Sequence, residues 1–152
     1  MLPRDYKGQE ACSVASTLAV IGDRWTMLIL REAFTRTRRF EDFQRTLGVA
    51  RNVLSDRLGR LVEEGVLERR PYQDHPVRYE YRLTDKGLDL WPILISLLKW
   101  GDRHAVDSPA RLIVHRGCGG EVTERLRCDV CGEDLGPRDV EVQPGPGAKL
   151  LA

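Results

Sequence analysis

No stretch of this 152-residue sequence is apolar for long enough to cross a membrane as a single helix. The longest apolar run is LWPILISLLKW, whereas a spanning helix needs about 18 or more predominantly apolar residues. The first residues also lack the basic and then apolar pattern that marks a secretory signal. We therefore expect a soluble protein of the cytoplasm.

The sequence also has almost no net charge, because 24 lysines and arginines stand against 23 aspartates and glutamates. The overall composition therefore does not indicate a nucleic-acid partner, and an argument for one must rest on where the charges lie. The length allows one domain of ordinary size and a small appendage.

Cysteine and histidine are scarce, with four and three residues. Without a secretory signal, the four cysteines belong to a reducing compartment, where thiols serve metals or redox chemistry more often than structural disulfides. An enzyme that used a metal as a Lewis acid would need an open coordination site and a nearby base. The histidines at positions 75, 104 and 115 form no such constellation, and neither an HExxH motif nor a nucleophile elbow is present. We expect the chain not to be an enzyme.

Four helical patterns come first along the chain, over residues 12–22, 24–36, 38–48 and 48–65. In each of them apolar side chains recur at spacings of three and four. Asp23 is a candidate N-cap for the second helix, whose wide apolar stripe indicates a central, buried position. The fourth helix is amphipathic, and its outward face holds Arg51, Asn52, Ser55, Asp56 and Gly59.

Two strand patterns follow, VLERRPY and RYEYRLT, and the segment QDHPV between them predicts a hairpin with a loose tip. Thr84 then caps a predicted helix over residues 85–105. Its segment 90–98 is apolar except for Ser96 and includes Pro92. A helix that is apolar nearly all round needs cover on more than one side, so we expect a homodimer interface here.

This order of elements predicts a mainly α fold with a small β wing, the winged helix-turn-helix. Such a fold reads bases with side chains near the N-terminus of one helix. Three residues there have suitable chemistry: Arg51 suits guanine, Asn52 suits adenine, and Ser55 suits either base. Residues 31–60 also hold eight arginines against four acidic residues. Candidate contacts to the DNA backbone or minor groove are Arg38, Arg39, Arg57, Arg69, Arg70 and Arg78.

Three runs of the sequence resemble a known family: CSVASTLAVIGDRWTMLILREAF, RRFEDFQRTLGVARNVLSDRLGRLVEEGVLERR and YEYRLTDKGLDLWPILISLLKWGDRH. They contain Gly-Asp-Arg-Trp, Arg-Phe-x-x-Phe, Leu-Ser-x-Arg-Leu, Gly-x-Leu-x-Arg, Tyr-x-Leu-Thr-x-x-Gly and Trp-Gly-x-x-His. Over residues 12–104 the chain is similar to the HxlR type of bacterial transcriptional regulators, relatives of the MarR group. The resemblance implies a homodimer, built with the N-terminal and long C-terminal helices, that binds a two-fold symmetric operator, more commonly as a repressor.

The resemblance also bears on Cys12, because some HxlR-type regulators carry at this place a cysteine that senses oxidants or electrophiles. The N-terminus of a helix favours the reactive thiolate form. Cys12 is therefore a possible redox sensor, with Cys12 of the other subunit or a small-molecule cap as its partner. The alternative is an unreactive, partly buried residue.

The tail departs from the plain family pattern. It contains two pairs of metal-binding residue types, His115 with Cys118 and Cys128 with Cys131. The members of each pair are separated by two residues, and nine residues lie between the pairs. Tetrahedral zinc takes four nitrogen or sulfur ligands, and such a gap lets one tight turn present two of them. We expect one structural zinc ion in a small C-terminal zinc ribbon, with residues 122–126 as a short strand. Asp129 or His104 could replace His115, and three free thiols with an unrelated histidine are the alternative.

The expected organisation is an N-terminal arm (1–11), a winged helix-turn-helix and dimerisation domain (12–106), a zinc-ribbon domain (107–143) and a flexible tail (144–152). DNA is not expected at residues 121–141, where seven acidic residues outnumber three arginines. A small-molecule effector is a further possible partner. Two alternatives stay open: arginines that merely solvate a helical face, and a zinc-dependent interaction adaptor with a degenerate winged helix.

Overall fold

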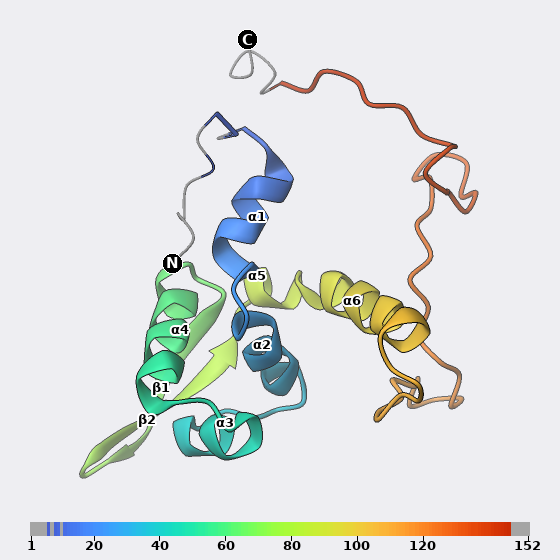
Figure 1. The fold of residues 1–152 in the computed structure, drawn as a ribbon. Coiled ribbons are helices and arrows are strands. Elements are labelled where there is room, and N and C mark those ends of the chain that lie inside the picture. The colour runs from blue at the N-terminus through green and yellow to red at the C-terminus, as the bar shows by residue number, and fades with distance from the viewer. Residues whose placement is uncertain (1–5, 7, 10, 147–152) are drawn as a thin grey trace. The chain divides into compact units, whose positions relative to one another are not determined.

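The computed structural model describes residue 6, residues 8–9 and residues 11–146 (Figure 1). Its elements in chain order are α1 (Ser13–Ile21), α2 (Thr26–Phe34), α3 (Phe40–Leu47), α4 (Arg51–Glu63), β1 (Leu67–Asp74), β2 (Val77–Leu83), α5 (Asp85–Leu88) and α6 (Trp91–His104). The described chain divides into two compact units, one up to Trp91 and one from Pro92 to Pro146. This division lies earlier along the chain than the boundary expected at residue 106.

The core of the first unit is formed by α2, α3 and α4 with the end of the hairpin. Ile29 and Leu30 of α2, Phe43 of α3, and Leu54 and Leu58 of α4 expose no surface. These side chains recur at the predicted helical spacing, so the predicted inward faces of α2, α3 and α4 are confirmed. Full burial of a large apolar side chain stabilises a fold by about 1.5–3 kcal/mol. The core thus holds α4 in a fixed orientation against α2 and α3.

Asp23 was predicted as the N-cap of α2; the N-cap position is Trp25, two residues later, but the Asp23 side chain still caps the start of the helix. Its carboxylate accepts hydrogen bonds from the backbone N–H groups of Trp25 at 3.0 Å and Thr26 at 3.1 Å. Arg57 of α4 donates to the same carboxylate at 2.8 Å. Burial opposes ionisation of Asp23, but its hydrogen bonds, led by that from the Thr26 hydroxyl, hold the pKa of the carboxyl below its usual range. One side chain therefore joins the start of α2 to the middle of α4.

Glycines end the first, third and fourth helices for two different reasons. Gly48 and Gly65 adopt left-handed backbone, with φ of 63° and 70°, and Gly65 directs the chain into β1 as predicted. Gly22 after α1 has φ of −80°. A Cβ atom at Gly22 would lie 2.4 Å from the carbonyl oxygen of Leu18, so the close approach of the backbone requires glycine there.

The wing is a two-stranded antiparallel sheet of β1 and β2. The predicted loose tip is wrong, because the strands pair up to Asp74 and Val77 and leave His75 and Pro76 as the turn. The pairing shifts register just after Pro71. Proline has no N–H to donate to a ladder, and such an irregularity accommodates it while the strands continue.

The predicted continuous helix over residues 85–105 is also wrong, because α5 ends at Leu88 and α6 begins separately. Thr84 caps α5 as predicted, since its hydroxyl oxygen accepts a hydrogen bond from the N–H of Gly87 at 3.1 Å. The break follows from Pro92. A proline ring clashes with the carbonyl group four residues earlier in a continuous helix, and that residue is Leu88.

The second unit contains most of α6 and the tail. Ile95 of α6 is buried, whereas Ile93, Leu97 and Trp100 are 37%, 52% and 60% exposed. The apolar segment 90–98 was expected to need cover from a second copy of the chain, and Ile93 and Leu97 of this segment are exposed in the single chain.

The described tail forms turns, and the short strand predicted within the ribbon is absent. Its two isolated β-bridges join Val114 with Glu121 and Arg127 with Asp134. Residues 122–126 do not form a strand. Small two-stranded ribbons are marginal without apolar cover, and Leu126 and Val130 are 72% and 90% exposed. Of the predicted ribbon, the two turns are therefore present and the strand between them is absent.

None of the described helices is by itself long and apolar enough to cross a membrane. Helices α1 and α2 taken together, bent by 79° at their junction, reach the necessary length and composition. Buried core helices have the same composition, and α2 is such a helix.

Candidate nucleic-acid interface

The outward face of α4 starts at the N-terminus of the helix. Arg51, Asn52 and Ser55 are exposed there, and Leu54 and Leu58 on the opposite side are buried. The predicted outward placement of the three polar residues is therefore confirmed. The N-terminus of a helix carries a partial positive charge, which favours a nearby anion.

Three exposed arginines lie over aromatic rings. They belong to the loop before α3, to α4 and to β1. Such a contact is worth about 0.5–1 kcal/mol at an exposed site, and it restricts a flexible side chain to one direction. An arginine that is already directed loses less conformational freedom when it binds an anion. The pairs, with the distance from Cζ to the ring centroid, are Arg51–Phe40 (4.8 Å), Arg39–Tyr72 (4.4 Å) and Arg69–Tyr79 (4.2 Å).

The loop between α2 and α3 is held by the wing. Arg39 forms an isolated antiparallel bridge with Glu80, and the N–H of Tyr81 donates to the carbonyl oxygen of Arg38 at 2.7 Å. The exposed arginines of this loop therefore keep a constant position relative to β2.

Arg57 has a different environment from the other candidate backbone contacts. It forms ion pairs with Asp23, at 2.8 Å, and with Asp56, and its side chain is 25% exposed. Its guanidinium group connects α4 to α2. Arg78 on β2, by contrast, is exposed.

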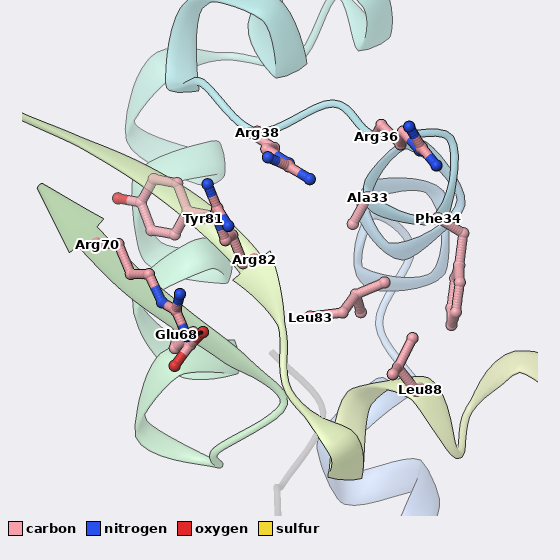
Figure 2. A pocket seen from close by; sticks show the side chains of 10 residues that line it. All are labelled: Ala33, Phe34, Arg36, Arg38, Glu68, Arg70, Tyr81, Arg82, Leu83 and Leu88. Atoms are coloured by element: carbon pink, nitrogen blue, oxygen red, sulfur yellow. Dashed lines mark ion pairs between the residues drawn. The ribbon is translucent and has the colours of Figure 1, made fainter. Parts of the chain in front are cut away.

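A cavity of about 370 Å³ lies beside the wing (Figure 2). Its walls come from α2, the loop after it, both strands and α5: Ala33, Phe34, Arg36, Arg38, Glu68, Arg70, Tyr81, Arg82, Leu83 and Leu88. Figure 2 shows the side chains of Arg36 and Arg38 on the loop, with Phe34 and Leu88 on neighbouring parts of the wall. The cavity thus combines a basic part with an apolar part.

The four arginines of the cavity are not equivalent. Arg70 pairs with Glu68, and Arg82 pairs with Glu80, both at 2.5 Å. Within the described part of the chain, the side chains of Arg36 and Arg38 form no ion pair. Arg36 also has φ of 69°, which is uncommon for a residue other than glycine. Backbone strain of this kind is often found at functional sites.

The sequence did not reveal this cavity. Its residues come from segments that are far apart along the chain, and no local pattern brings Arg36 together with Arg82. Arg70 was expected beside Arg69, yet successive side chains of a strand point to opposite faces. Arg69 therefore lies over Tyr79, whereas Arg70 lines the cavity.

The four predicted zinc ligands form two pairs. Nδ1 of His115 lies 3.3 Å from Sγ of Cys118. In the second pair, hydrogen bonding led by the backbone N–H of Cys131 holds the pKa of Cys128 below its usual range. No group of three or more histidine, cysteine, aspartate or glutamate residues in the described chain is close enough together to hold a metal ion.

Cys12 occupies the N-cap position of α1 and is partly buried. Its predicted position before the first helix is confirmed. All four cysteines are free thiols.

The packing of α2, α3 and α4 with the wing, together with the basic outward face of α4, defines a winged helix-turn-helix protein that binds DNA. Residues 20–108 match the HxlR-like helix-turn-helix family, and the chain belongs to that family. Curated relatives carry the name HTH-type transcriptional regulator. The chain is accordingly a transcriptional regulator.

Several relatives are similar over nearly the whole chain. The HTH-type transcriptional regulator Rv3095 of Mycobacterium tuberculosis is 45% identical over 142 residues, which is 92% of this chain and 90% of Rv3095. The crystal structure of PA1607, a candidate transcription factor, has a TM-score of 0.82 and 40% identity, and the match covers 90% of this chain and 97% of PA1607.

A second solved structure, the candidate transcription factor PA1374 of Pseudomonas aeruginosa, has a TM-score of 0.67 and 36% identity. The match covers 92% of this chain and 98% of PA1374. The three alignments each cover at least nine-tenths of the chain, so each extends beyond residue 108. The similarity therefore includes part of the tail.

Proposed function

We propose that the chain represses transcription as a homodimer that binds a two-fold symmetric operator. The observation that carries the proposal is the exposed start of α4, where Arg51, Asn52 and Ser55 stand among arginines directed by aromatic rings. Arginine suits guanine, asparagine suits adenine and serine suits either. The reading helices of a symmetric dimer lie about 34–36 Å apart, one turn of DNA. A dimer bound at the operator would hinder the access of RNA polymerase to the promoter. The family resemblance also implies repression as the more common mode of regulation.

Contacts to phosphates are best supported for Arg39, Arg69 and Arg78. All three are exposed, and the first two are already directed by tyrosine rings. Such contacts fix the position of the protein on the duplex and make binding dependent on salt. Arg38, Arg57 and Arg70 were also expected to contact the DNA backbone. Arg38 and Arg70 line the cavity, and Arg57 and Arg70 form ion pairs with acidic residues, so a contact with DNA phosphates is less well supported for these three.

The proposed dimer is supported by apolar side chains that the single chain leaves uncovered. Val14 and Leu18 of α1 are 68% and 44% exposed, and Leu97 and Trp100 of α6 are 52% and 60% exposed. Exposed apolar faces of this kind mark interfaces between proteins. A second copy of the chain is the proposed cover for both helices.

Operator binding tests the base-reading assignment. We expect Arg51→Ala and Asn52→Ala each to weaken binding to a promoter fragment from the protein's own genomic neighbourhood by about 1–3 kcal/mol, with relaxed preference at one base position. Gel shifts across a salt series measure this effect, and Arg125→Ala in the tail is the charge-matched control. If both variants keep the sequence preference, the assignment is wrong. If the dimeric wild type gives no specific shift, an interaction adaptor becomes the better account.

A redox role for Cys12 stays a prediction. The same titration, repeated on oxidised protein with Cys12→Ser as the control, tests it. A loss of operator binding on oxidation in the wild type but not in the variant would support sensing. An equal response of both proteins would exclude Cys12 as the sensor.

We further propose that the regulator responds to a small organic anion with an apolar part, bound in the cavity of Figure 2. Ligand pockets commonly measure about 300–1,000 Å³, and this cavity falls within that range. Arg36 and Arg38 supply positive charge without an ion-pair partner in the described chain, and Phe34 and Leu88 supply apolar surface. The loop that carries these arginines continues into Arg39, so an occupant would affect a proposed phosphate contact.

Tryptophan fluorescence offers a test, because the rings of Trp91 and Phe34 are 5.1 Å apart. We expect benzoate to change the fluorescence saturably, and benzyl alcohol, which lacks the charge, to act weakly. Arg36→Gly removes one charge and tolerates the left-handed backbone, so it should weaken benzoate binding while operator binding persists. Arg45→Ala on α3 is the control. Equal binding of benzoate to wild type and Arg36→Gly would count against the cavity as the site.

A further inference from the structure

The two turns of the tail have the same backbone hydrogen-bond pattern. In the first turn, His115 N–H donates to Gly120 at 2.8 Å, Gly119 N–H donates to His115 at 2.8 Å, and Val122 N–H donates to Ile113 at 3.0 Å. In the second turn, Cys128 N–H donates to Glu133 at 3.0 Å, Gly132 N–H donates to Cys128 at 3.0 Å, and Leu135 N–H donates to Leu126 at 2.9 Å. The second set of bonds repeats the first at a constant displacement along the chain.

The backbone conformation repeats as well. Gly119 and Gly132, which follow the second residue of each pair, both have φ of 75°. An isolated β-bridge closes each turn, and its partners also correspond between the two turns. Two segments with different sequences have therefore adopted one local structure. Left-handed glycine lets the chain reverse directly behind each pair.

This correspondence helps to choose the fourth metal donor among His115, Asp129 and His104. His115 occupies in the first turn the position that Cys128 occupies in the second, and Cys118 corresponds to Cys131. Asp129 lies between the two cysteines of the second turn and corresponds to Arg116, which is not a metal-binding residue type. His104 belongs to α6 and lies outside both turns. The repeated structure thus favours His115 over these two competitors.

The space around the first pair also suits a bound ion. The ring of His115 lies over Gly117, where a Cβ atom would be 2.9 Å from Cε1, and Nδ1 is 3.3 Å from Sγ of Cys118. Glycine at this position therefore lets the imidazole and the thiol lie side by side. Cys118 and Cys131 are exposed, and Cys128 is partly exposed, so donors of both turns are accessible.

We propose that the two turns close on one structural zinc ion, with His115, Cys118, Cys128 and Cys131 as its four ligands. Three sulfurs and one imidazole nitrogen are a common tetrahedral zinc set, and a filled set leaves no position for catalytic water. Each cysteine binds as thiolate and gives its proton to solvent, while neutral histidine binds through one ring nitrogen. The proposal does not depend on operator binding.

Closure requires the interval between the pairs, residues 119–127, to adjust. Most of this interval is exposed, so little packing opposes a change. Metal binding commonly completes the folding of such small segments, because the ion supplies the core that the chain lacks. Leu126, two residues before the ligands of the second turn, and Val130, between them, are 72% and 90% exposed.

Metal content of the full-length, reduced protein is the first test. We expect about one zinc ion per chain, and a loss of bound zinc in Cys118→Ser, Cys128→Ser and Cys131→Ser. Cys12→Ser is the matched control, since it removes a thiol outside the turns. Helical circular dichroism, which reports elements outside the tail, checks that each variant is folded. Absence of zinc from the reduced wild type after incubation with the ion would overturn the proposal, as would a full zinc content in Cys128→Ser.

Cobalt spectra then test the histidine. Co²⁺ in a tetrahedral thiolate site absorbs through ligand-to-metal charge transfer, and the intensity follows the number of thiolates. His115→Cys should keep the metal and raise that intensity by about a third, from three thiolates to four. His115→Ala should lose metal affinity, whereas His104→Ala and Asp129→Asn should keep the wild-type spectrum. Unchanged intensity in His115→Cys, or a changed spectrum in His104→Ala or Asp129→Asn, would overturn the assignment of His115.

Discussion

At the scale of single residues, Asp23 shows what the sequence can and cannot predict. Its role as the cap of α2 was predictable, because a cap depends on neighbours in the chain. Its ion pair with Arg57 was not, because that pair depends on the packing of α4 against α2. The same limit applies to Arg57, whose predicted contact with the DNA backbone took no account of its ion pair with Asp23.

Replacement of Asp23 by asparagine should lower the free energy of unfolding by about 1–2 kcal/mol near neutral pH. Asparagine can still accept from the backbone N–H groups, but Arg57 and the Thr26 hydroxyl lose their charged acceptor. The pKa of Asp23 is depressed in the folded state, so its contribution is complete above the unfolded value of about 4 and is lost as pH falls through the folded value. Urea unfolding at pH 7 and pH 3 should therefore show a difference between wild type and Asp23→Asn that shrinks in acid.

Asp42→Asn is the matched control for that experiment. Asp42 lies on α3 and pairs with the exposed Arg45. Exposed pairs of this kind contribute about 0–1 kcal/mol. A pH-independent difference for Asp23→Asn, or an equal effect of Asp42→Asn, would contradict the role assigned to Asp23.

At the scale of elements, the helices of the core were predictable and the junctions were not. Apolar spacing locates α2, α3 and α4 because each buries one face of its own. The break between α5 and α6 depends on a clash between Pro92 and the carbonyl of Leu88, which periodicity alone does not weigh. The strand expected at residues 122–126 depends on a core that the tail lacks.

Two glycines allow a prediction at this scale. A Cβ atom at Gly87 of α5 would lie 2.2 Å from the carbonyl oxygen of Val66, whereas a Cβ atom at Gly59 of α4 would meet nothing within 4 Å. Gly87→Ala should therefore destabilise the fold by about 1–3 kcal/mol through overpacking. Gly59→Ala should stabilise it by about 0.5–1 kcal/mol through helix propensity. Chemical unfolding followed by circular dichroism measures both, and effects of the same sign would contradict this account of α5.

At the scale of the whole molecule, the winged helix-turn-helix and the regulator class were predictable from element order, motifs and local charge. The cavity was not, because its walls come together only in the folded chain. The apolar segment of α6 predicted a surface that needs cover, and Leu97 of that segment and the nearby Trp100 are exposed in the single chain.

A charge on that exposed surface should separate the proposed dimer. We expect Leu97→Asp to shift the protein toward the monomer in light scattering and to weaken binding to the full operator more than to a half-site, because burial of an unpaired carboxylate is unfavourable. Val142→Asp, at a fully exposed position in the tail, is the control. A monomeric wild type, or a dimeric Leu97→Asp with unchanged affinity, would contradict the proposed interface.

The alternation of Arg69 and Arg70 limits how the wing can change in length. Arg69 lies over Tyr79 on one face of β1, and Arg70 lines the cavity on the other. Insertion of one residue ahead of them in the strand would exchange the two faces and carry every later side chain to the wrong side. Related sequences should therefore vary in length at the His75–Pro76 turn and tolerate no single insertion or deletion between Leu67 and Arg70.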